Sequence, residues 1–127
     1  MASRGGSKAK ARTFRIKRVY DALEDGDGLR VLVDRLWPRG LSKAKAHVDL
    51  WLKDLAPSED LRHKFHDSDI GWREFANGYK RELAQEPAAS AVQTLLQRRE
   101  KTITLLYASK DEEHNNALVL AAWLQKR

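Results

Sequence analysis

The fold is decided by Thr102-Ile103-Thr104-Leu105-Leu106-Tyr107-Ala108, a run of apolar and β-branched residues. Such a run is typical of an interior strand of a parallel sheet, because both faces of that strand are covered. A helix is expected directly after it, since Ser109 and Glu112 have the spacing of a capping box and residues 117–124 are apolar nearly all round. A strand that leads straight into a buried helix indicates a parallel α/β sheet.

Further elements lie on the N-terminal side of this strand. Residues 14–20 and 29–33 have strand character, and residues 47–52 are the remaining candidate strand. Three helices are expected in between: one capped by Ser58, one over residues 70–85 with an aromatic stripe, and one that begins at Pro87. We therefore predict an α/β fold, with a small, largely parallel sheet of three to four strands and helices packed on its faces.

Composition limits the class of protein. The chain of 127 residues has the usual size of one domain, with 42% hydrophobic and 33% charged residues. It contains no cysteine, which excludes disulfides, thiolate catalysis and cysteine-bound zinc. No apolar run reaches the roughly 18 residues of a membrane helix, and the N-terminus lacks the apolar core of a secretory signal. We expect a cytoplasmic protein with no membrane partner.

The net charge of +6 is unevenly distributed. Residues 1–12 contain four basic residues and no acid, so the remainder carries only +2. We interpret residues 1–12 as a disordered basic tail and residues 13–127 as a single α/β domain. A basic tail can bind a phosphate backbone weakly and in a salt-dependent way, although a solubilising extension is the simpler interpretation.

The first candidate functional segment is Asp34-Arg35-Leu36-Trp37-Pro38-Arg39-Gly40, which follows a buried strand. Ligands of open α/β sheets bind beyond the carboxyl ends of the strands, where this segment is expected. Arg35 and Arg39 suit a phosphate or a carboxylate, and Trp37 suits a base or a sugar. In the structural alternative, Asp34 and Arg35 fasten the loop and Trp37 belongs to the core.

The second candidate segment runs from Tyr107 to Asn116 and forms a strand-to-helix turn. His114 is suited to act as a general acid or base near neutral pH. Asn115 and Asn116 are poor helix formers whose amides need partners when buried, which suggests that they are used in binding. Free N–H groups at the helix start favour an anion, whereas the three acids beside them favour a cation or an arginine. The structural alternative is that these side chains satisfy loop backbone.

The two segments converge if their strands are parallel neighbours, because both follow the carboxyl end of a strand. The candidate catalytic residues are Asp34 and His114, and the candidate ligand-binding residues are Arg18, Arg35, Trp37, Arg39, Tyr107, Lys110, Asp111, Asn115 and Asn116. We expect no cofactor and no metal: His63, His66, Asp67 and Asp69 lie close in sequence, but no further ligand spacing supports a metal site.

Four blocks of this sequence resemble the YeaO-like branch of a bacterial family of unknown function, number 488. They are residues 14–21, residues 30–40, residues 49–58, and residues 105–108 together with 111–117. The resemblance covers roughly residues 13 to 127 and implies a fold and a site more than an activity.

Broader relatives of that family carry an Asp-x-Arg-like motif near the first block and a Cys-x-Glu…Cys-His-Arg motif near the last. Asp34-Arg35 looks like the former. Tyr107 falls where the first cysteine would be, and Glu113-His114-Asn115 falls near Cys-His-Arg. The thiol chemistry that such a motif implies does not carry over to a chain without cysteine. Some members are labelled transcriptional regulators, but this sequence has no winged-helix pattern.

Three functions remain open. The first is an enzyme, or an enzyme-derived domain, that binds a small phosphate-bearing, nucleotide-like molecule at the carboxyl ends of the strands. The second is a nucleic-acid-binding module that uses the basic tail together with Arg15, Lys17, Arg18 and Trp37. The third is a non-catalytic structural or partner-binding domain, in which the polar side chains of the two segments hydrogen-bond one another and no cavity lies beside them.

Overall fold

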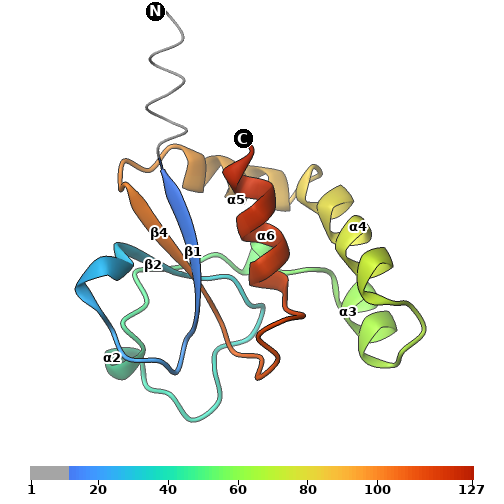
Figure 1. Cartoon of the computed structure of the whole chain (residues 1–127), viewed down its shortest axis with the longest axis horizontal. Coiled ribbons are helices and arrows are strands. Elements are labelled where there is room, and N and C mark those ends of the chain that lie inside the picture. Colours follow the sequence, from blue (N-terminus) through green and yellow to red (C-terminus); the bar gives the residue numbers. More distant parts are fainter. Residues whose placement is uncertain (1–11) are drawn as a thin grey trace, which may run out of the picture.

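The computed structural model describes residues 12–127 and confirms the predicted α/β fold (Figure 1). In chain order the elements are β1 (Thr13–Arg18), the 3-10 helix η1 (Asp25–Asp27), β2 (Leu29–Leu32), α2 (Lys43–Ala46), β3 (Leu50–Trp51), the 3-10 helix η2 (Lys53–Leu55), α3 (Glu59–His66), α4 (Trp72–Leu83), α5 (Ala88–Leu96), β4 (Thr102–Tyr107) and α6 (Asn116–Gln125). Each expected strand and helix is present, although the expected third strand is reduced to the two residues of β3.

The four strands form one sheet in the order β1-β4-β2-β3, and all neighbouring pairs are parallel. Leu105 of β4 pairs with Ile16 of β1 on one side and with Val31 of β2 on the other. The apolar run that suggested an interior strand is therefore central. All strands end at the same edge of the sheet, which we call the carboxyl edge; the β1 and β4 arrows point downward toward it in Figure 1.

The two faces of the sheet are covered differently. Alternate strand residues, including Val31 and Leu105, pack with α4, α5 and α6 in the larger apolar core. The residues between them, including Leu32 and Leu106, pack with Ala46 of α2 in a smaller core. The long helices thus cover one face, and loops with short helical turns cover the other.

An ion cluster is buried under the loop-covered face. The Asp27 carboxylate accepts hydrogen bonds from Arg30 Nη1 at 2.6 Å and from Lys17 Nζ at 3.1 Å. Both the Asp27 and the Arg30 side chains are 1% exposed, and Arg30 also donates to the carbonyls of Ala46 and His47. Burial opposes ionisation of Asp27, but the Glu24 N–H and the two cations outweigh it and hold the pKa of Asp27 below its usual value.

A single glycine allows the turn into β2. Gly28 has a φ of 63°, and a Cβ at this position would lie 2.2 Å from the Thr102 carbonyl oxygen. Only glycine fits this backbone, because a side chain would both strain the left-handed conformation and collide with β4. The turn carries Asp27 over the sheet, where its carboxylate meets Arg30.

The start of α6 differs from the prediction. The helix begins at Asn116 rather than directly after Ser109, so Ser109 and Glu112 do not form its capping box. Asn115 is the capping residue instead, and its Oδ1 accepts from Leu118 N at 2.8 Å. The acids before it belong to a turn in which the Asp111 carboxylate accepts from Glu113 N and His114 N. The first turn of α6 therefore contains no acid.

The predicted tail lies almost entirely outside the described residues, which begin at Arg12. The prediction places Arg12 in the tail, but its guanidinium donates to the carbonyls of Leu95 and Leu96, at the end of α5, and of Arg98. It thereby fastens the start of β1 to the end of α5. Over residues 12–127, no helix is long and apolar enough to span a membrane.

Candidate functional site at the carboxyl edge

A cavity of about 630 Å³ opens at the carboxyl edge, beyond the ends of β2 and β4. Its walls come from the loop after β2, from α3 and α4, and from the turn between β4 and α6. The lining residues are Tyr20, Asp34, Arg35, Leu36, Trp37, Pro38, Arg39, Ala56, Pro57, Arg62, Phe65, His66, Phe75, Ala108, Ser109, Asp111, His114, Asn115 and Asn116. The structure therefore brings together the two segments that the sequence singled out, because β2 and β4 are parallel neighbours.

Asp34 lies where β2 ends and is held by the neighbouring strand. Its Oδ2 accepts from Ala108 N at 2.9 Å, and its backbone carbonyl accepts from Trp51 Nε1 at 2.8 Å. Burial raises the pKa of Asp34, and the hydrogen bonds from Ala108 N and the Asn116 amide only partly oppose this effect. Within the described chain no cation forms an ion pair with this carboxylate, so its charge is not neutralised.

Three guanidinium groups line the cavity. Arg35 Nη2 donates to the Pro57 carbonyl at 3.2 Å, which uses one of its donors. Arg39 is exposed, and its carbonyl accepts from Tyr20 Oη at 2.8 Å. Arg62, on α3, is 3.9 Å from Glu59 across an exposed pair, a distance at which little stability is gained. All three keep donors that can meet an anion.

Trp37 has a largely structural position in the loop. Its Nε1 donates to the Leu41 carbonyl at 2.6 Å, and its ring meets Trp51 edge to face at a centroid distance of 5.4 Å. The indole lines the cavity but belongs to the smaller core. The structural alternative therefore describes Trp37 better than base stacking does.

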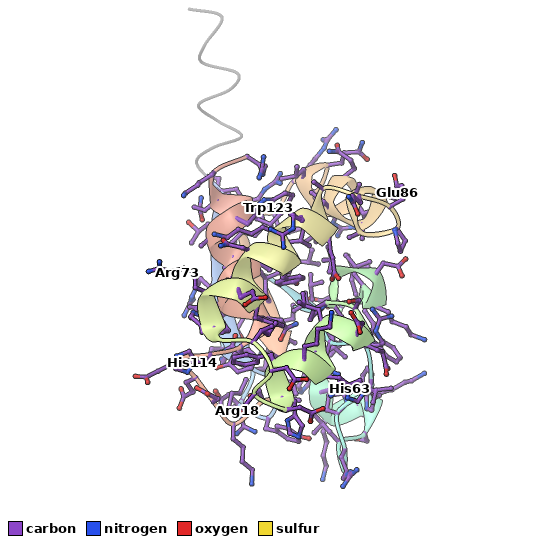
Figure 2. All side chains as sticks on the ribbon, turned by 90° about the vertical axis from the view of Figure 1, so that its right-hand side faces the viewer. Arg18, His63, Arg73, Glu86, His114 and Trp123 are labelled. Atoms are coloured by element: carbon purple, nitrogen blue, oxygen red, sulfur yellow. The ribbon has the colours of Figure 1, made fainter. Side chains whose placement is uncertain are left out.

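His114 and Asp111 form the opposite rim. His114 Nδ1 lies 3.3 Å from Asp111 Oδ2, and the imidazole meets the Trp72 ring edge to face at 5.0 Å. The Glu113 and His114 N–H groups hold the pKa of Asp111 below its usual value, and the imidazole adds to this effect. In Figure 2, His114 lies at the edge of the molecule, near the start of α4.

The two asparagines connect the turn to the sheet. Asn115 Nδ2 donates to the Asp111 carbonyl at 3.0 Å while its Oδ1 caps α6. Asn116 Nδ2 reaches across to the Val33 carbonyl at 3.1 Å. Both amides satisfy backbone groups, as the structural alternative expected, but they do so at the floor of an open cavity, which that alternative did not expect.

Three predicted site residues lie apart from the cavity lining. Tyr107 is buried among the larger core, 2% exposed, and burial raises its pKa. Arg18 donates to the carbonyls of Ala108 and Ser109 and so fastens the turn after β4. Lys110 is exposed outside the lining. No group of three potential metal ligands gathers anywhere in residues 12–127.

Sequence reasoning missed the helical wall. Arg62, Phe65 and His66 of α3, and Phe75 of α4, line the cavity. The spacing of the first three residues puts them on one face of α3. In a sequence, a helix face that contains an aromatic residue is normally interpreted as packing against the core, so it does not indicate a ligand site. Only the packing of α3 beside the carboxyl edge turns that face into a wall of the site.

Fold and cavity together define a small parallel α/β domain with a ligand-sized cavity at the carboxyl edge of its sheet. Residues 13–127 match the model of a family described as "Inactive DUF488-N3 subclade", and the chain belongs to this family. The resemblance noted in the sequence is thereby confirmed.

Related proteins are uncharacterised. The protein YeaO of Escherichia coli (strain K12) is 44% identical over 110 residues, which cover 86% of this chain and 94% of YeaO. The protein Mb3100c of Mycobacterium bovis is 38% identical over 113 residues, which cover 89% of this chain and 94% of the relative. No solved structure matches the chain significantly.

Proposed function

We propose that this domain binds a small phosphate-bearing molecule, of the nucleotide kind, in the carboxyl-edge cavity and catalyses no reaction on it. The observation that carries the proposal is the gathering of Arg35, Arg39 and Arg62 around one cavity from two different parts of the fold. Guanidinium groups meet phosphate oxygens with paired hydrogen bonds, so three of them at one rim favour a phosphate over a neutral ligand.

The rest of the lining suits the remainder of such a ligand. Phe65 and Phe75 lie 4.9 Å apart between ring centroids and form an apolar wall for a planar ring. Asp34, at the floor, offers a carboxylate that accepts hydrogen bonds from a hydroxyl or an amino group. A volume of about 630 Å³ is within the usual range for a small-molecule site.

The groups predicted to be catalytic support binding more than catalysis. Asp34 holds the Ala108 N–H, and the Nδ1 atom of His114 is turned toward Asp111 while its ring rests on Trp72. His114 is thus engaged in holding its turn, and one carboxylate oxygen of Asp34 is engaged with Ala108 N. The family description, which names an inactive subclade, agrees with a domain that kept a pocket without its reaction.

Calorimetric titration of the full chain with AMP and with inorganic phosphate tests the proposal. We expect AMP to bind and Arg62→Ala to weaken it by about 10- to 100-fold, the effect of losing a charged hydrogen bond. Arg73→Ala is the matched control, because Arg73 is an exposed arginine of the adjacent helix α4 outside the cavity lining. The proposal fails if AMP gives no binding heat, or if both variants weaken binding equally.

A further inference from the structure

The opposite edge of the sheet collects a different set of charges. There the start of β1, the connection from α5 to β4 and the end of α6 lie together, at the top of Figure 1. Thr13 N donates to the Lys101 carbonyl at 2.8 Å. Gln125 joins α6 to β1, because its Nε2 donates to the Arg12 carbonyl and its Oε1 accepts from Phe14 N. These contacts bring the three segments, which carry basic residues, to one end of the sheet.

We call four exposed basic residues at this place the basic edge: Arg99, Lys101, Lys126 and Arg127. None of the four forms an ion pair with any side chain in the described part of the chain. The neighbouring Arg98 is neutralised by Glu100 at 2.8 Å. Arg127 lies over the Trp123 ring at 3.8 Å, a contact that keeps its charge.

The basic edge supplies a large part of the positive charge of the protein. It carries four positive charges, so the formal net charge without them would be +2 instead of +6.

The basic residues that the sequence had suggested for a nucleic-acid surface are engaged elsewhere. Lys17 pairs with Glu24 and Asp27, Arg15 donates to the Gly26 carbonyl, and Arg18 fastens the turn after β4. Lys17 is thus neutralised and Arg18 is used by the fold, while Arg15 keeps further donors. No hydrogen bond or ion pair within residues 12–127 engages the side-chain cations of the basic edge, so their donors are free for phosphate.

We propose that the basic edge binds the phosphate backbone of nucleic acid, independently of base sequence. Lysine and arginine side chains on one surface neutralise phosphates and release counterions, which needs no groove and no base contact. A membrane surface fits less well, because peripheral binding usually adds apolar side chains to the charges. The large exposed apolar residues, Tyr20, Leu23, Leu36 and Leu118, lie outside the basic edge. This site is independent of the cavity.

Fluorescence anisotropy of the full chain with a labelled 20-base-pair duplex tests the proposal across a series of salt concentrations. We expect affinity to fall steeply with salt, with a slope of about −0.9 per neutralised phosphate. The double variant Arg99→Glu/Lys101→Glu should weaken binding at low salt by about tenfold or more and make the slope shallower by roughly two contacts.

The matched control is Lys43→Glu/Arg73→Glu, which makes the same change in net charge. Both residues are exposed, and neither belongs to the basic edge. They lie in the first turns of α2 and α4, where the helix dipole stabilises an acidic side chain, so the two substitutions should not destabilise the fold. An equal loss in both double variants would assign binding to net charge and overturn the proposal. Absence of salt-dependent DNA binding, or binding to phosphatidylserine vesicles in its place, would overturn it as well.

Discussion

Two aspartates of this domain lie in environments that differ in charge compensation. Asp27 lies under the loop-covered face between Lys17 and Arg30, and its pKa is lowered although it is buried. Asp34 lies at the carboxyl edge without a cationic partner, and burial raises its pKa. One carboxylate is neutralised by the fold, and the other keeps an uncompensated charge beside a cavity.

This difference separates a group that holds the fold from a group available to a ligand. A buried charge with two partners and a backbone donor is a structural element, and removing it leaves Arg30 uncompensated. A partly buried charge without a cation, such as Asp34, is costly, and a costly group at a cavity is a candidate for function. The comparison can be tested by changing each aspartate in turn.

The largest effect is expected from Asp27→Ala. The variant leaves the Arg30 guanidinium buried at 1% exposure without its carboxylate, so the free energy of unfolding should fall by about 3–5 kcal/mol. Urea denaturation followed by tryptophan fluorescence measures this loss. A loss below about 1 kcal/mol would mean that the ion cluster does not hold the loop over the sheet.

A much smaller effect is expected from Asp34→Asn. The amide oxygen still accepts from Ala108 N, and the cost of burying an unpaired charge disappears. The free energy of unfolding at pH 7 should therefore change by less than about 1 kcal/mol, while AMP affinity should fall, as measured by the same calorimetric titration. A destabilisation as large as that of Asp27→Ala would show that Asp34, too, is a structural residue.

The smallest expected effect, and the most diagnostic one, is the change in the free energy of unfolding with pH. The contributions of Asp27 and Asp34 to this free energy should change with pH in opposite directions. Because the folded pKa of Asp27 is lowered, its contribution to stability is complete above the unfolded pKa and is lost as pH falls through the folded pKa. Because the folded pKa of Asp34 is raised, its contribution is complete below the unfolded pKa and is lost as pH rises through the folded pKa.

Denaturation of the wild type, Asp27→Asn and Asp34→Asn between pH 3 and pH 7 measures this difference. The advantage of the wild type over Asp27→Asn should shrink toward pH 3. Relative to Asp34→Asn, the wild type should gain stability as pH falls from 7 toward 4. Curves that move in the same direction for both variants would contradict the assignment of the two environments.

The outline of the site could be predicted from the sequence because strand ends are local features. The apolar run before Asp34 and the run that ends at Tyr107 both stop at polar segments, and parallel strands bring such ends to one edge. The roles of individual side chains could not be predicted. The side chain of Tyr107 points to the face of the sheet that carries the larger core. Asn115 is the capping residue of α6, six residues after Ser109, which was the predicted cap.

The helical wall and the basic edge could not be predicted for a different reason. Arg62 and Phe65 enter the site through the packing of α3, and the end of α6 comes to the start of β1 because α6 packs along this strand. Such meetings depend on contacts between distant parts of the chain. Local propensity carries no information about them.

The sequence by itself determined the element types, the central place of β4 and the edge where polar residues gather, because hydrophobic periodicity and strand ends are written in local order. Tertiary structure alone decided which aspartate is neutralised. Asp27 and Asp34 are the same residue type seven positions apart, and their pKa values move in opposite directions only because the turn at Gly28 lays one beside Arg30 and Lys17. Charge compensation is a property of three-dimensional neighbours.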